Sequence, residues 1–247
     1  MQTERQTRFT AGWSRLLDWV YPGRCDQCGC GLSGQRSLCV ECEEAIPGLR
    51  RPFCEVCGLM FHGVIERAFE CPNCRSQRFA FEFARSGVPR NPGVLEMIHA
   101  FKYAKRLELG YELAGLAARA FDDSRLAFPL AERWPLVPVP LHRGRYGWRQ
   151  FNQAEEIARH LGHRVGLPVC HGLKRLRATV TQTRLTRRQR QKNLKGAFEA
   201  RVKRLSGVFG VILVDDVLTT GSTVHECAKV LRRAGVQKVI VVTVMRG

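Results

Sequence analysis

The chain has 247 residues, enough for one sizeable α/β core and a small additional module. Its 40 Lys and Arg residues outnumber 22 Asp and Glu residues, and the resulting formal charge of +18 favours polyanionic partners such as phosphorylated small molecules or nucleic acid. The N-terminus is polar and charged, and no segment is long and apolar enough to span a bilayer. We therefore expect a cytoplasmic protein without a secretory signal or a membrane span.

The first predicted element is a short amphipathic helix near the N-terminus. Its apolar residues follow helical spacing at Trp13, Leu16, Leu17 and Val20. This pattern favours a helix that docks against the body of the protein, and contact with a membrane is the alternative.

Cysteines dominate residues 1–80, which hold nine of the eleven in the chain. Eight of them form paired CxxC knuckles, with Cys25, Cys28, Cys39 and Cys42 in the first set and Cys54, Cys57, Cys71 and Cys74 in the second. A CxxC knuckle places two thiolates on one side of a tight turn, and two knuckles complete a tetrahedral zinc site. Gly29 and Gly58 follow the second cysteine of the leading knuckles, where a turn often needs a positive φ.

These two sets predict two structural zinc sites, or about two zinc ions per chain. Sequential pairing of the knuckles is the simplest arrangement, and a cross-braced arrangement that joins the first pair to the third is the alternative. Disulfides and redox or iron–sulfur chemistry are weaker interpretations, because a cytoplasmic chain keeps its thiols reduced and four knuckles in paired sets are typical of ribbons.

After a connector strand and two helices, the pattern predicts a parallel sheet with crossover helices, because short β-rich runs alternate with helical segments from residue 131 onward. The expected helices cover 94–105, 107–121, Asn152–Leu161 and Ser222–Ala234, and the expected strands cover Pro135–Pro140, Val211–Val214 and Lys238–Val244. Asn152 is the expected N-cap of its helix, with Glu155 at the capping-box position.

The segment Val211–Thr223, VILVDDVLTTGST, joins a buried strand, two adjacent acids and a hydroxyl-rich turn that leads into a helix. Open α/β sheets bind ligands at the carboxyl ends of their strands, and a helix N-terminus offers unpaired N–H groups to a phosphate. Gly221 allows a close backbone approach, while Asp215 and Asp216 suit the vicinal hydroxyls of a sugar. Hydroxyl donors come from Thr219, Thr220, Ser222 and Thr223. A helix-capping turn preceded by two surface acids is the alternative.

This segment resembles the signature of the type I phosphoribosyltransferases. The resemblance implies a Rossmann-like type I phosphoribosyltransferase fold that binds 5-phosphoribosyl-1-pyrophosphate together with Mg²⁺. By the same resemblance, Asp215 and Asp216 would hold the ribose hydroxyls, and Thr219–Thr223 would hold the 5′-phosphate.

Two basic segments complete the predicted site. Residues 137–153 begin at the end of a predicted strand and resemble the pyrophosphate-binding loop of these enzymes. The resemblance implies that Arg143 and Arg145 bind diphosphate oxygens with their guanidinium forks. A solvated basic turn is the alternative. Three aromatic side chains of this segment could stack on bases or lie in the core: Tyr146, Trp148 and Phe151.

Residues 174–204 contain twelve Lys or Arg residues and one acid. Part of this run lies where the family has a mobile loop that closes over the active site, which implies Arg187 and Arg190 as catalytic cations. Contact with the backbone of single-stranded DNA and a merely solvated basic face are the alternatives. Lys102 and Lys105, at the end of the first predicted helix, are further candidates for diphosphate contact.

A wider resemblance covers nearly the whole chain. Five segments together resemble the ComF family of competence-associated proteins: the cysteine-rich N-terminus, FKYAKR at 101–106, VPVPLHRGRYGWRQFNQAEEIA at 137–158, TQTRLTRRQRQKNLKGAF at 181–198 and the Val211–Thr223 loop. The resemblance implies a zinc-ribbon module at 1–80, a phosphoribosyltransferase-like domain at 81–247, and a link to uptake of transforming DNA.

Two functions from different classes fit these features. The first is an enzyme that transfers the phosphoribosyl group to an acceptor, which the sequence does not identify. The second is a protein that binds single-stranded DNA or senses the metabolite without turnover.

Overall fold

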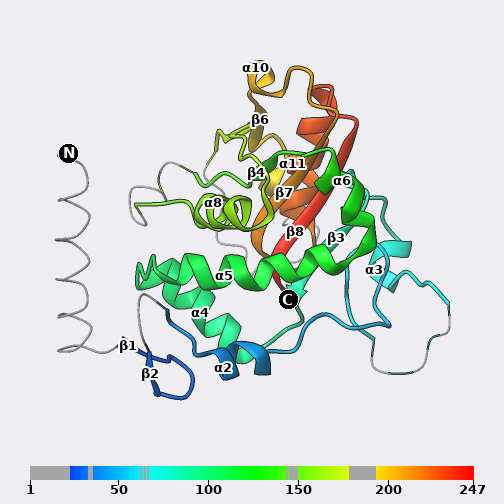
Figure 1. Cartoon of the computed structure of the whole chain (residues 1–247). Coiled ribbons are helices and arrows are strands. Elements are labelled where there is room, and N and C mark those ends of the chain that lie inside the picture. Colours follow the sequence, from blue (N-terminus) through cyan, green and yellow to red (C-terminus); the bar gives the residue numbers. More distant parts are fainter. Residues whose placement is uncertain are drawn as a thin grey trace, which may run out of the picture. The chain divides into compact units, whose positions relative to one another are not determined.

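The computed structural model describes residues 23–32, 36–61, 63, 65, 67–142, 144, 150–177 and 193–247 (Figure 1). The chain divides into two compact units, Met1–Ile46 and Pro47–Gly247, which we describe separately. The helix predicted around residues 13–20 lies outside the described residues. None of the helices in the described ranges has the length and apolar character required to cross a bilayer.

The described part of the first unit is a small cysteine-containing turn structure. β1 (Gly23–Arg24) pairs antiparallel with β2 (Gly31–Leu32), and the first CxxC knuckle lies between them. The predicted positive φ is confirmed at Gly29, where it is 74°. α2 (Val40–Ala45) follows, and Cys39 is its N-cap residue, so one turn supplies the second knuckle.

A four-stranded parallel sheet with the order β3-β8-β7-β4 forms the centre of the second unit. Its strands are β3 (Ala84–Val88), β4 (Leu136–Pro138), β7 (Gly210–Leu218) and β8 (Lys238–Arg246). Most of their residues are buried, as expected of parallel strands covered on both faces. A parallel bridge between Leu136 and Val169 extends the sheet beyond β4. The predicted parallel α/β sheet is therefore confirmed.

β7 is longer than the predicted strand Val211–Val214. Its ladder with β8 continues past that point, with Asp215 opposite Thr243 and Val217 opposite Met245. The two acids therefore lie within the carboxyl-terminal half of the strand and not in a loop after it. Pairing with a central neighbour outweighs the low strand propensity of aspartate.

Helices cover both faces of this sheet. In chain order, α4 (Pro92–Tyr103) and α5 (Leu109–Ala118) come after β3 and before β4, and α8 (Gln153–Val165) follows β4 (Figure 1). α5 packs against β3, β8 and α8, while α8 packs against β4 and β7, so these two helices share one face. α11 (Ser222–Arg233) connects neighbouring β7 and β8, and a right-handed crossover places it on the other face. The four predicted helices are thus present, each within a turn or so of its expected ends.

Shorter elements complete the described fold: α3 (Pro72–Arg75), η1 (Arg119–Asp122), η2 (Ser124–Leu126), α6 (Ala127–Ala131), β5 (Leu173–Arg175), β6 (Phe198–Ala200) and α10 (Val202–Leu205). The antiparallel pair β5–β6 brings together the two ends of the basic segment between them. The sequence does not predict this pair, because strands of three residues carry almost no periodicity.

The start of α8 shows one wrong detail of the sequence prediction. Asn152 is the N-cap residue, but its side chain makes no capping hydrogen bond. Its Nδ2 instead donates to the carbonyl of Val139 at 3.2 Å. Glu155, expected to complete a capping box, lies 3.6 Å from Nδ1 of His171. The Asn152 side chain thus ties the start of the helix to the end of the β4 segment, and this tertiary contact takes the place of the local cap.

The second cysteine segment belongs to the compact unit that contains the sheet. The backbone N–H of Ala84 donates to the carbonyl of Val56 at 2.7 Å. The buried guanidinium of Arg85 pairs with Asp123 at 2.6 Å and with Glu55 at 3.3 Å. The compact unit that contains the sheet begins at Pro47. The predicted boundary between a zinc-ribbon module at 1–80 and a second domain at 81–247 stays a prediction.

Candidate functional site

The two acids of β7 form the centre of the candidate ligand site. Asp216 is buried and Asp215 is partly exposed. Each side chain accepts a hydrogen bond from the next backbone N–H, at 3.0 Å for Asp215 and 2.8 Å for Asp216. Their own carboxylates thus stabilise the backbone at this end of the strand.

Lys102 forms an ion pair with Asp216. The lysine lies in the last turn of α4, and its side chain is 19% exposed. The sequence predicts Lys102 only as a diphosphate contact, so the pairing with an acid of the ribose site is a finding of the structure. The ion pair offsets the charge of one of the two adjacent carboxylates.

The environment of Asp215 disfavours its ionised form. Burial of the carboxyl group, the adjacent Asp216 charge and the side-chain hydrogen bond between the two acids raise the pKa of Asp215 to about 7, although Lys102 and the backbone N–H of Asp216 act in the opposite direction. A group that titrates near neutral pH inside a candidate ligand site is a common feature of functional sites.

The turn after β7 has the geometry of an anion site at a helix N-terminus. Gly221 is the N-cap of α11 and has the left-handed conformation, with φ 75° and ψ 2°. The hydroxyls of Thr220 and Ser222 lie 2.9 Å apart. The Ser222 N–H donates to Oγ1 of Thr220 at 3.4 Å, and the positive end of the helix dipole at this turn favours a phosphate. Thr219 and Thr223, the other predicted donors, belong to the same turn.

Residues 79 and 80, which precede β3 in the chain, contact this turn and the start of α11. A Cβ atom on Gly221 would lie 3.1 Å from Cε1 of Phe79, so the glycine also permits this close packing. The backbone N–H of Ala80 donates to Nδ1 of His225 on α11 at 3.0 Å. No local sequence pattern predicts these contacts, because they join segments about 145 residues apart.

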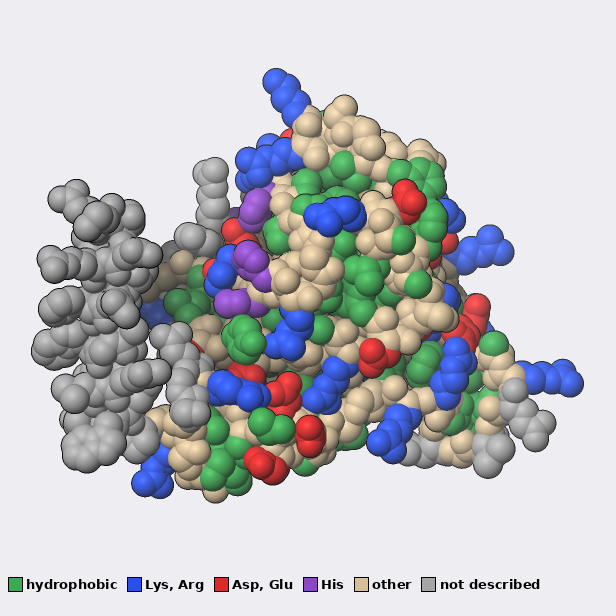
Figure 2. All heavy atoms as spheres, in the orientation of Figure 1, with side chains coloured by type: hydrophobic (Ala, Val, Ile, Leu, Met, Phe, Trp, Pro, Cys, Tyr) green, Lys and Arg blue, Asp and Glu red, His purple; other side chains and the backbone are tan. Residues whose placement is uncertain are grey.

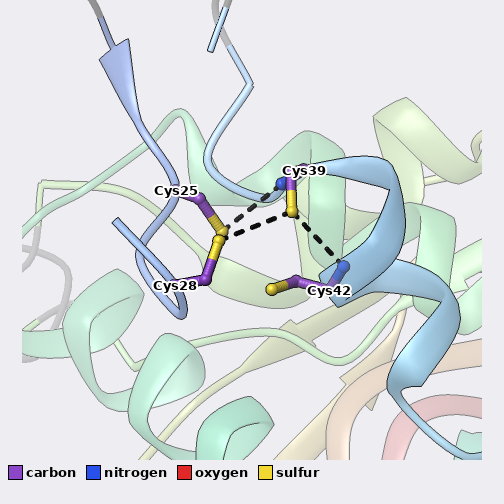
Figure 3. Close-up of side chains that lie close together, drawn as sticks. All are labelled: Cys25, Cys28, Cys39 and Cys42. Atoms are coloured by element: carbon purple, nitrogen blue, oxygen red, sulfur yellow. Dashed lines mark hydrogen bonds between the residues drawn. The ribbon is translucent and has the colours of Figure 1, made fainter. Parts of the chain in front are cut away.

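The eight predicted cysteine ligands form two clusters with the expected sequential pairing. In each cluster the four Sγ atoms lie within 4.8 Å of one another. Figure 3 shows the sulfur atoms of the first cluster turned toward a common centre. The pairs Cys28–Cys39 and Cys57–Cys71 have Sγ atoms 3.7 Å apart. Zinc–sulfur bonds of about 2.3 Å give a tetrahedral edge of about 3.8 Å, so both clusters fit zinc.

The two clusters differ in burial. All four cysteines of the second cluster are buried and belong to the same hydrophobic core as residues of β7 and α11. In the first cluster Cys28 is exposed and Cys42 is half-buried. The hydrogen bond from Cys54 lowers the pKa of Cys57 to about 6 against the effect of burial, and the nearby charge of Arg246 acts in the same direction. The second cluster is therefore an integral part of the unit that holds the ligand site.

Several predicted site residues lie outside the described residues: Arg143, Arg145, Arg187 and Arg190. The structure describes only the flanks of their segments. The N–H of Val139 donates to the carbonyl of Val214 at 2.9 Å, so the 137–153 segment leaves the sheet beside the residue that precedes Asp215. Phe151 is buried and packs against Phe101 with ring centroids 5.1 Å apart, which assigns it to the core and not to base stacking.

Comparison with known proteins agrees with both halves of this arrangement. Residues 16–75 match the double zinc ribbon domain family, and residues 152–247 match the phosphoribosyl transferase domain family. Competence protein F of Haemophilus influenzae is 32% identical over 222 residues, which cover 87% of this chain and 93% of that protein. DNA utilization protein YhgH of Salmonella typhi is 32% identical over 218 residues, with coverage of 87% and 92%.

A more distant relative has the same extent. Competence protein ComFC of Bacillus subtilis is 24% identical over 218 residues, which cover 83% of this chain and 81% of that protein. The similarity therefore spans the cysteine clusters and the parallel sheet together. The chain belongs to the ComF family, with a double zinc ribbon and a phosphoribosyl transferase domain in one polypeptide.

Proposed function

We propose that this protein binds 5-phosphoribosyl-1-pyrophosphate with Mg²⁺ at Asp215–Thr223 and transfers its phosphoribosyl group to an acceptor. The observation that supports this most strongly is the sequence of features along β7 and α11. Two adjacent acids lie in the carboxyl-terminal half of a buried parallel strand, and a left-handed glycine with flanking hydroxyls starts the next helix. Acids suit the ribose hydroxyls, and the helix N-terminus suits the 5′-phosphate.

The cations of the chain have separate roles in this proposal. Arg143 and Arg145 would bind the diphosphate, and Arg187 and Arg190 would close over it from the 174–204 segment. Lys102 would leave Asp216 when the ribose hydroxyls take its place, and its ammonium group would then be free to approach the leaving diphosphate. Guanidinium and ammonium groups stabilise the charge that develops on the leaving oxygens.

The carboxylate oxygens of Asp215 and Asp216 are hard ligands of the kind that Mg²⁺ prefers, so the site fits this ion. When bound, Mg²⁺ would neutralise part of the diphosphate charge. The two four-cysteine clusters would hold about two structural zinc ions.

In the proposed reaction, the bond between ribose C1 and the diphosphate oxygen breaks, and its electron pair leaves with the diphosphate. A nitrogen nucleophile of the acceptor forms the new bond to C1 and releases a proton to solvent. The described residues offer positioning and electrostatic stabilisation for an oxocarbenium-like state, which are the main contributions of protein groups in such transfers.

Thermal unfolding tests the ligand assignment. We expect phosphoribosyl pyrophosphate with Mg²⁺ to raise the melting temperature, because a ligand that binds only the folded state stabilises it by mass action. The double variant Asp215→Asn/Asp216→Asn should keep its ligand-free fold and lose this shift. A double variant that responds like the wild type would show that the ribose assignment is wrong.

The second candidate function is binding of single-stranded DNA or sensing of the metabolite without turnover. The relatives named for competence and DNA utilization link this family to DNA uptake, and the charge of +18 suits a polyanion. On the face shown in Figure 2, however, Lys and Arg side chains of the described residues are spread among acidic and apolar ones. A screen for pyrophosphate release with candidate bases separates the two functions, since only the enzyme releases pyrophosphate.

A further inference from the structure

One guanidinium group connects the second cysteine cluster to the phosphate loop. Arg246 is the last residue of β8 and is only 6% exposed. Its Nη1 donates to the carbonyls of Leu218 at 2.6 Å and Thr219 at 2.9 Å, where β7 leads into the loop. Its Nη2 donates to Sγ of Cys57 at 3.5 Å. The same side chain therefore contacts a predicted metal ligand and the backbone that begins the anion site.

A small cavity lies between the cluster and the loop. Its volume is about 60 Å³, and its lining includes Cys57, Cys74, Phe79, Thr219–Gly221 and Arg246. A space of this size holds a few water molecules and is too small for a nucleobase. The cluster and the loop are thus walls of one small space.

The charge and shape of arginine suit this position. Zn²⁺ bound by four thiolates has a net charge of −2, and N–H groups that donate to metal-bound sulfur orient the ligands and are oriented by them. The guanidinium is planar and always charged, so it can donate to sulfur on one side and to two carbonyls on the other. When the metal is present, it fixes the position of Cys57 Sγ and, through it, the plane of the guanidinium.

We infer that Arg246 is a positioning residue that transmits the metal occupancy of the second cluster to the conformation of the phosphate loop. Without the metal, weak hydrogen bonds between thiols, such as the 3.7 Å contact of Cys57 Sγ with Cys71 Sγ, replace the metal–sulfur bond that fixes Cys57 Sγ. Arg246 then loses one of its fixed contacts, and the carbonyls of Leu218 and Thr219 lose a rigid donor. The inference rests on the proposed function only in naming the ligand of this loop.

Hydrogen exchange in the ligand-free, full-length protein tests this coupling directly. We expect amides of residues 218–223 to exchange roughly tenfold faster or more in Arg246→Met, because charge-assisted hydrogen bonds that restrain local opening are lost. Zinc content should stay at the wild-type value, and amides of α5 should keep their protection. Arg246→Lys, which keeps the charge without the planar fork, should give an intermediate rate. Unchanged exchange at 218–223 in both variants would overturn the inference.

Metal removal gives the second arm of the experiment. Cys28→Ser in the first cluster provides a matched control, since its zinc lies in the other compact unit. Loss of that zinc should leave exchange at 218–223 unchanged, while chelation of the remaining zinc should accelerate it. In a Cys28→Ser/Arg246→Met protein, chelation should add little further acceleration. Equal acceleration with and without Arg246 would show that the metal acts through another route and would refute the role of Arg246.

Ligand binding separates this inference from the proposed function. If wild-type protein binds phosphoribosyl pyrophosphate, Arg246→Met should weaken that binding at unchanged zinc content. If wild-type protein does not bind it, the proposed function fails, and the exchange measurements still decide the coupling.

Discussion

The Asp215–Asp216 pair makes the proposed ligand site sensitive to pH. The folded state raises the pKa of Asp215 from 3.8 to about 7, with burial as the largest cause. Between these two pH values the folded state binds a proton that the unfolded state releases, so this group lowers the folding stability as pH rises through that window. Ligand affinity should depend on pH in the opposite direction and rise with pH, because an ionised carboxylate accepts hydrogen bonds from ribose hydroxyls more strongly.

We predict that affinity for phosphoribosyl pyrophosphate with Mg²⁺ rises up to about tenfold between pH 6 and pH 8, as the ionised fraction of a group with pKa near 7 rises from about a tenth to about nine tenths. Calorimetry at constant ionic strength measures it. Asp215→Asn serves as the control for titration of the ligand phosphates and should bind more weakly with a flatter pH profile. The idea fails if the profiles of the two proteins are parallel.

Some residues of the site follow from local sequence and others depend on contacts between distant segments. The type and order of residues in Val211–Thr223 predict the acids, the glycine and the hydroxyls of the site, because all of them lie in one short segment. The pairing of Lys102 with Asp216 joins two segments that no local pattern relates. Arg246 contacts Cys57 across 189 positions, so neither spacing nor periodicity predicts it.

The start of α11 depends on a glycine whose backbone conformation other residues rarely adopt. Gly221 has φ 75°, and a Cβ atom added to it would crowd Cε1 of Phe79 at 3.1 Å. Gly166, which ends α8, has a similar φ of 72° but faces open space. Substitutions at these two glycines therefore separate the free-energy cost of a left-handed backbone conformation from the cost of disturbing the phosphate loop.

We predict that Gly166→Ala lowers the free energy of unfolding by about 1 kcal/mol, the usual cost of a left-handed alanine, without changing ligand affinity. Gly221→Ala should cost more and should also weaken ligand binding, because its methyl group displaces Phe79 or the loop. Urea unfolding and calorimetry measure the two effects. Similar ligand affinity in both variants would argue against a phosphate contact at this turn.

Elements with strong patterns could be predicted and short ones could not. The apolar run of β8 and the amphipathic pattern of α11, which ends before Gly235, specify a buried strand and a helix by local rules. The three-residue strands β5 and β6 form only because their segments meet in the folded chain. The side chain of Asn152 likewise prefers the Val139 carbonyl, a partner that exists only after folding.

The charge of +18 on the chain favours a small phosphorylated ligand, a nucleic acid or both as partners. Twelve of the 40 basic residues lie between 174 and 204, a segment whose two ends the β5–β6 pair brings together. Arginines that close over a diphosphate cannot contact a DNA backbone at the same time. If both uses occur, the two ligands must compete for the same side chains.

We predict weak binding of single-stranded DNA with a log–log salt slope of roughly −0.7 per phosphate neutralised. Charge reversal at Arg187, Arg188 and Arg190 should flatten that slope.

Saturating phosphoribosyl pyrophosphate with Mg²⁺ should weaken DNA binding several-fold, and linkage requires DNA to weaken binding of the small ligand by the same factor. Fluorescence anisotropy measures the effect. Ionic strength and free Mg²⁺ are held constant, because added salt and free Mg²⁺ each weaken DNA binding on their own. The Asp215→Asn/Asp216→Asn protein is the matched control, since it keeps the basic segment and loses the small ligand. DNA affinity that is unchanged by the ligand would place DNA on a separate surface, with the zinc ribbons as the next surface to test.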